Sequence, residues 1–120
     1  MFLYNIFGDY NMLDKYFGFT EIKNEVAVIE SLLEHTRIDE QELLLTKELF
    51  QSLINEDRHN LDATHLKIIK IRSDSNRVFE HTEEQIIQAH FDYQKQYDFL
   101  RIYQRIECIS TDILNISNLV

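Results

Sequence analysis

A polar pair lies within KIIKIRSDSNRVF, residues 67 to 79, where an apolar helix face is expected. If Ile68 and Phe79 face the core, a helical turn of about 100° per residue places Arg72 and Asn76 on or beside the same face. A partly buried arginine needs a counter-charge, because removing an unpaired charge from water is costly. The segment therefore indicates a buried ion pair, provided that a carboxylate lies opposite.

A second polar pair lies within RIECISTDILNIS, residues 105 to 117. The same projection puts Glu107 at the margin of an apolar stripe, with Thr111 one turn later. Glu107 is thus a candidate counter-charge for Arg72. Alternatively, the two charged side chains extend separately to solvent along their apolar stems, and the residues alone leave both possibilities open.

No other pattern in the chain points to catalysis or to a metal site. The sequence contains no G-x-S-x-G, no glycine-rich phosphate loop, no H-E-x-x-H and no pair of cysteines. None of its five histidines lies three or four residues from another, as a helical pair of metal ligands would. We therefore expect a protein that is not an enzyme, with no catalytic residue, no metal and no other cofactor.

The composition predicts one folded domain over residues 1–120. With 12 basic and 21 acidic residues the formal net charge is −9, which disfavours binding to nucleic acid. The only cysteine, Cys108, cannot form an intramolecular disulfide, which is typical of a cytoplasmic protein. No stretch approaches the ~18 consecutive apolar residues of a membrane span, so no membrane insertion is expected.

The chain has no proline and only two glycines, Gly8 and Gly18, so the remainder favours helices over β-turns. One amphipathic helix is expected over residues 21–36, with Thr20 as its cap and an inward face formed by apolar residues at three- and four-residue steps: Ile22, Val26, Ile29 and Leu33. A separate helix is expected from Glu40 to about Asn55.

The start of that second helix carries the clearest local signal. Asp39 is placed as an N-cap, and Glu42 three residues later closes a capping box. After a turn in residues 56–60, a third helix is expected from Leu61, continuing through Thr82. The last segment has a regular apolar stripe at helical spacing: Phe99, Ile102, Tyr103, Ile106, Ile109, Ile113, Ile116 and Val120. One-sided stripes and short joints predict an all-α, antiparallel bundle of three to four helices.

Residues 1–19 are rich in apolar side chains, and we expect this segment to cap one end of the bundle. Phe2, Leu3 and Phe7 are also candidates for contact with a partner protein, although burial against the bundle is favoured because monomers rarely expose large apolar patches.

Three segments of the chain resemble the PhoU-like family, in particular the small helical proteins associated with inorganic phosphate permeases. MFLYNIFG resembles the apolar opening of the family, and HLKIIKIRSDSNRVFEHTEEQI resembles the helix that carries its first E-x-x-x-D motif. DFLRIYQRIECISTDILNIS resembles the helix that carries its second acid-rich motif. The resemblance implies a helical bundle in which acids on facing helices bind iron, zinc or related cations.

The chain departs from that pattern at the metal-binding positions. The first motif has Arg72 and Asn76, and the second retains Glu107 but has Thr111 in place of the next acid. Our hypothesis is that the Arg72 guanidinium replaces the cation and pairs with Glu107 across the bundle.

The resemblance implies a non-enzymatic accessory or regulatory protein of phosphate transport. It would act by contact with another protein, such as a phosphate permease, or as a homodimer formed through its long last helix. A helical adaptor or antitoxin-like module unrelated to phosphate is the alternative. A carboxylate metal protein is the weakest alternative, and its metal site would be built from Glu107, Asp112, Asp74 and His65.

Overall fold

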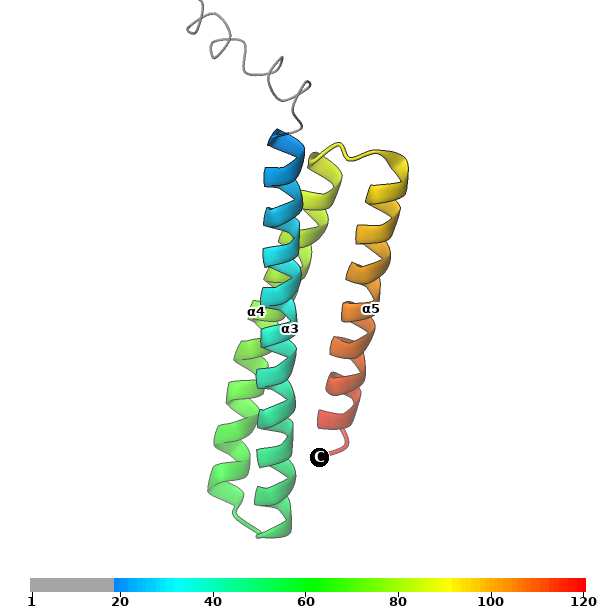
Figure 1. Cartoon of the computed structure of the whole chain (residues 1–120). Helices are drawn as coiled ribbons and strands as arrows, with labels where there is room; N and C mark the ends of the chain where they lie inside the picture. The colour runs from blue at the N-terminus through cyan, green and yellow to red at the C-terminus, as the bar shows by residue number, and fades with distance from the viewer. Residues whose placement is uncertain (1–18) are drawn as a thin grey trace, which may run out of the picture.

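The computed structural model describes residues 19–120, and these form three helices without a strand (Figure 1). The helices are α3 (Phe19–Ile54), α4 (Arg58–Gln88) and α5 (Tyr93–Ser117). The chain runs along α3, returns along α4 and reverses again into α5, so α4 is antiparallel to both neighbours. The predicted all-α antiparallel bundle is confirmed. None of these helices is long and apolar enough to cross a membrane.

The predicted cap of the bundle comprises residues 1–19, and all of these except Phe19 lie outside the described part of the chain. The same holds for Phe2, Leu3 and Phe7 as partner contacts. Both remain predictions.

The helix α3 is continuous, and the predicted break before Glu40 is wrong. The helix begins at Phe19, so Thr20 lies inside it instead of capping it. Asp39 is not an N-cap but a buried residue in the middle of α3, where Ser110 of α5 donates a hydrogen bond to its carboxylate. No glycine or proline lies near Asp39, so the backbone hydrogen bonds of the helix continue through it. Asp39 and Glu42, the two acids of the predicted capping box, contact Ser110 and Arg72 on the other helices instead.

The inward face of α3 also differs from the prediction. The four residues expected in the core are about half exposed: Ile22, Val26, Ile29 and Leu33. Val28 and Leu32 are buried instead, and His35 continues their line along the helix. The physical reason is that α3 contributes polar side chains to the centre of the bundle, so its most apolar face is not its buried face.

The turn between α3 and α4 has the hydrogen bonds of a Schellman motif. Asp57 N–H donates to the Ser52 carbonyl, with N to O at 2.9 Å, and Glu56 N–H donates to the Leu53 carbonyl at 3.2 Å. Glu56 has φ of 56°, the left-handed conformation that usually selects glycine. Asp57 then caps α4 by accepting a hydrogen bond from Asn60 N–H at 3.1 Å. The predicted turn is confirmed, in a shorter form.

The helix α4 continues through Thr82 as predicted and ends at Gln88. Its turn into α5 contains a second left-handed residue, His90, with φ of 53°. Asp92 caps α5 by accepting a hydrogen bond from Lys95 N–H at 2.9 Å. Both turns are therefore set by an aspartate N-cap that follows a left-handed residue.

A cluster of buried hydrophobic residues lies where the beginning of α3, the end of α4 and the beginning of α5 meet. Its buried members are Val28, Leu32, Ile86, Phe91, Tyr103 and Ile106. Phe79 and Tyr103 stack with ring centroids 4.3 Å apart, and the Tyr103 hydroxyl donates to Glu83 at 2.9 Å. This aromatic layer directly borders the polar centre of the bundle, because the His35 ring meets Phe79 edge to face at 6.0 Å.

Candidate functional site: a buried polar cluster

Three ionisable residues of α3 lie on successive turns and face the interior. His35, Asp39 and Glu42 are 0%, 5% and 1% exposed. Their spacing of four and three residues puts them on one side of a helix. Burying three ionisable groups in a small bundle is costly unless each is paired or neutralised, so their partners on the other helices determine what the cluster can do.

Ser110 of α5 joins two of these residues. Its hydroxyl donates to Asp39 Oδ1, and its oxygen lies 3.1 Å from His35 Nε2. Because the Ser110 proton is used on Asp39, this chain of hydrogen bonds assigns the imidazole proton to Nε2, which then donates to Ser110. His35 Nδ1 is left as an acceptor, and it has no hydrogen-bond partner in the described part of the chain.

The buried carboxylate of Glu42 is paired with Arg72 of α4. Arg72 Nη1 donates to Glu42 Oε1 at 3.2 Å, and the arginine side chain is 28% exposed while that of Glu42 is 1% exposed. The predicted counter-charge, Glu107, lies near His35 instead, with its Oε2 3.8 Å from His35 Nε2. Arg72 still acts on Glu107 through space, since its charge opposes the rise in the pKa of that carboxyl.

The other two predicted positions do not belong to the cluster. Asn76 and Thr111 are exposed, whereas Ser75 and Ser110, one residue earlier on each helix, are buried. Ser75 Oγ lies 3.5 Å from His35 Nε2. The predicted positions lie four residues after Arg72 and Glu107, but the buried serines lie three residues after them.

The charges of the cluster are not balanced. Burial raises the pKa of Asp39, Glu42 and Glu107. The negative charge of Asp39 raises the pKa of both glutamates further, and Arg72 opposes the rise for each. Burial lowers the pKa of His35, against the attraction of Asp39. The cluster therefore favours neutral histidine and carboxyl groups that hold their protons more tightly than they would in water.

A serine, a histidine and an aspartate in contact invite comparison with a hydrolytic triad, but the order of the contacts differs. Ser110 donates directly to Asp39, and its side chain is buried, with the residue 6% exposed. A nucleophile needs its base within reach and a substrate beside it. His35 Nε2 is within reach of Ser110, but the serine proton is donated to Asp39 and the hydroxyl is buried, so Ser110 instead connects α5 to α3.

The cluster does not provide the set of ligands that the family resemblance implies for a metal centre. Within residues 19–120, no three histidine, cysteine or acidic side chains are placed to hold one ion together. Arg72 already supplies a positive charge to Glu42. The alternative set is not assembled either, because Asp74 pairs with Arg77 at the surface and Asp112 is exposed. The residues present do not fit the metal that the family binds.

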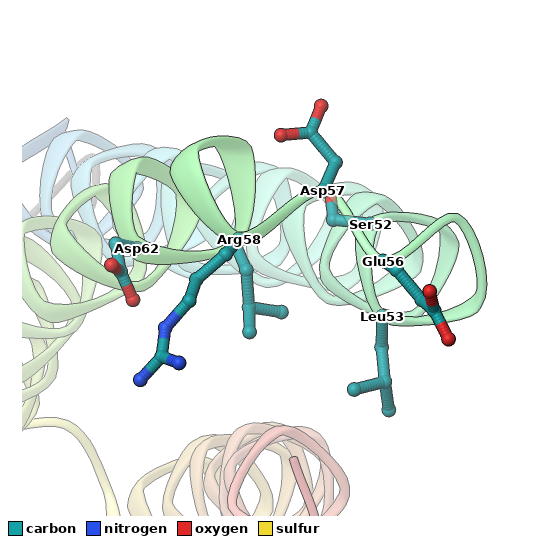
Figure 2. A pocket seen from close by; sticks show the side chains of 7 residues that line it. Ser52, Leu53, Glu56, Asp57, Arg58 and Asp62 are labelled. Atoms are coloured by element: carbon teal, nitrogen blue, oxygen red, sulfur yellow. The ribbon is translucent and has the colours of Figure 1, made fainter.

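A shallow surface pocket lies at the turn between α3 and α4, away from the cluster. Figure 2 shows that the Asp57 carboxylate points away from Arg58 and Leu53. The one buried polar residue of this pocket, Ser52, already accepts a hydrogen bond from Asn60 at 2.6 Å. The pocket therefore has no buried polar atom left for a ligand.

No family model matches the chain, and no curated protein or solved structure matches it either.

Proposed function

We propose that this chain is a non-enzymatic accessory or regulatory protein of phosphate transport that acts in the cytoplasm through contact with other proteins. Its partners are a phosphate permease and a second copy of itself, and nucleic acid is not among them. The link to phosphate rests on the resemblance of three sequence segments to the PhoU-like family. The mode of action rests on the surface of the bundle.

The observation that supports a function in protein binding is the number of apolar side chains exposed on the surface of the bundle. On α3, Ile22, Ile29 and Leu43 are 55%, 46% and 51% exposed. On α5, Ile102 and Ile109 are 47% and 52% exposed. A bundle whose centre is polar and whose flanks are apolar offers surfaces that suit protein partners better than small molecules.

The same surfaces also suit a helical adaptor or antitoxin-like module unrelated to phosphate. Arg72 and Asn76 favour this second candidate, because they stand where the family has the carboxylates of its metal site. The two candidates differ in the partner and not in the mode of binding.

Phosphate uptake by cells separates them. Deleting the gene should change the initial rate of labelled phosphate uptake, and expressing the chain again should restore it. The purified chain should also bind the phosphate permease of the same cells in detergent. A Leu66→Lys variant, altered on the exposed side of α4, is the matched control and should behave as the wild type. Unchanged uptake together with no binding to the permease would overturn the proposal in favour of the adaptor.

A further inference from the structure

A line of half-exposed isoleucines follows α5. Ile102, Ile109 and Ile116 are 47%, 52% and 43% exposed and lie seven residues apart, so they share one side of the helix. Lys95, seven residues before Ile102, is on the same line, and its Nζ contacts Glu21 at 2.6 Å and also Glu25, both on α3. The isoleucine line therefore runs along the flank of α5 that borders α3.

The neighbouring flank of α3 is apolar too. Ile29, Leu33 and Leu43 are 46%, 50% and 51% exposed. In a helical projection with about 100° per residue, these three side chains point within about 100° of the direction of Glu25 around the α3 axis. They lie on the side of Glu25 that is away from the buried Val28. The two helices run in parallel, since the Lys95 contacts and the bond between Ser110 and Asp39 follow the same direction. The two apolar flanks thus border one seam, which we call the α3/α5 seam.

The isoleucine line is symmetric about its middle member. A two-fold axis at Ile109, perpendicular to α5, brings an antiparallel second α5 into the seam. Ile109 then meets Ile109 of the second copy, and Ile102 lies opposite Ile116 of the second copy. An isologous interface requires this self-complementarity: if one residue of the first copy contacts another residue of the second copy, the reverse contact forms as well.

The charges beside the isoleucines obey the same symmetry. Arg105 and Asp112 are exposed, lie seven residues apart and form no ion pair with residues 19–120. The axis at Ile109 places Arg105 beside Asp112 of the second copy, and the reverse pair forms on the other side. An unrelated partner would not need this arrangement.

We infer that two copies of this chain associate through the α3/α5 seam, so that α3 and α5 of each copy form a four-helix bundle with antiparallel α5 helices at its centre. The inference rests on the self-association included in the proposed function and specifies its surface. A second copy of α5 covers Ile29, Leu33 and Leu43 of the first copy, together with both isoleucine lines.

Sedimentation equilibrium of the full chain is the first test. The wild type should be a dimer, and Ile109→Lys should be a monomer with an unchanged helical circular dichroism spectrum. Leu66→Lys, which places the same charge at a 69% exposed position of α4, should remain a dimer. A monomeric wild type, or a dimeric Ile109→Lys, would overturn the inference. If the wild type is a monomer and a chain lacking residues 1–18 dimerises, that segment occupies the seam instead.

Charge exchange tests the register without adding a charge to the apolar line. Arg105→Asp and Asp112→Arg should each weaken the dimer at least about tenfold, because each places like charges together twice. The double variant should restore the affinity of the wild type. Equal weakening in the double variant would refute the pairing.

Cys108 provides an independent measurement of the face. It is exposed, it is the only cysteine in the chain and it is adjacent to Ile109. A short bis-maleimide should therefore link two copies of the wild type. A dimer by sedimentation that gives no such cross-link would contradict this interface while leaving the phosphate proposal to its own uptake test.

Discussion

Removing Arg72 should destabilise the bundle through the unpaired carboxylate of Glu42 that it leaves behind. The test variant is Arg72→Met, which keeps much of the apolar stem and removes the charge. Glu42 then stays 1% exposed without its hydrogen-bonded cation. Breaking a buried ion pair from one side typically costs 3–5 kcal/mol, but the Arg72 side chain is 28% exposed, so we expect about 2 to 3 kcal/mol.

The assay is urea unfolding followed by circular dichroism, supported by thermal melting. For a domain of this size that loss lowers the melting temperature by about 8 to 12 °C. Arg72→Ala should be less stable than Arg72→Met, since it also loses the packing of the stem. The double variant Arg72→Met with Glu42→Gln should recover to within about 1 kcal/mol of the wild type, because no buried charge remains.

Arg77→Met is the matched control on the same helix. Arg77 pairs with Asp74 at the surface, with side chains 76% and 41% exposed, so its loss should cost at most about 1 kcal/mol. If Arg72→Met costs no more than this control, or if the double variant is as unstable as the single one, the reasoning about an uncompensated charge is refuted.

Three further changes follow from the structure. Glu107→Gln should be more stable than the wild type near pH 7 and equally stable near pH 4. The reason is that the pKa of Glu107 is raised in the folded state, so the wild type loses stability as the pH rises above the unfolded-state pKa of 4.5. Parallel stability curves of the two proteins in pH-dependent urea unfolding would contradict this. Glu56→Gly should add about 0.5 to 1 kcal/mol by relieving the left-handed conformation, and a loss of stability on melting would show that the glutamate side chain matters more than its backbone. Asp92→Ala should cost about 1 kcal/mol by removing the cap of α5, with Asp92→Asn close to the wild type, and equal losses in both variants would exclude the capping contact.

The sequence predicts the fold class well, because the absence of proline and the regular apolar spacing of the last helix leave few alternatives to a bundle. It fails where polar residues occupy the interior. Asp39 and Glu42 have the spacing of a capping box, and only their contacts with Ser110 and Arg72 show that they are buried. Local sequence cannot distinguish an acid that caps a helix from one that pairs with a neighbouring helix.

For the same reason, the sequence does not predict the correct partner of Arg72 or the burial of His35. Arg72 was expected to need a carboxylate, and it has one, but the partner is on α3 and not on α5. His35 has no helical metal-ligand spacing to another histidine, and its sequence alone does not mark it, yet it is fully buried at the centre of the cluster. The spacing of Val28, Leu32 and His35 by four and three residues indicates a shared helix face. The face with Ile22 and Val26 contains more apolar residues, and for that reason it was the face predicted to be buried.

The polar cluster also fixes how far each helix can slide along its neighbours. Apolar contacts tolerate a shift of one turn, about 5.4 Å, because another branched side chain arrives at the vacated position. Such a shift of α5 along α3 would separate Ser110 from Asp39 and from His35 at once. Single buried polar contacts are known to select one alignment of packed helices at some expense of stability. In this bundle, the alignment of α5 is thus encoded in a few hydrogen bonds, and it is that alignment which keeps the isoleucines of α5 in line with the apolar flank of α3.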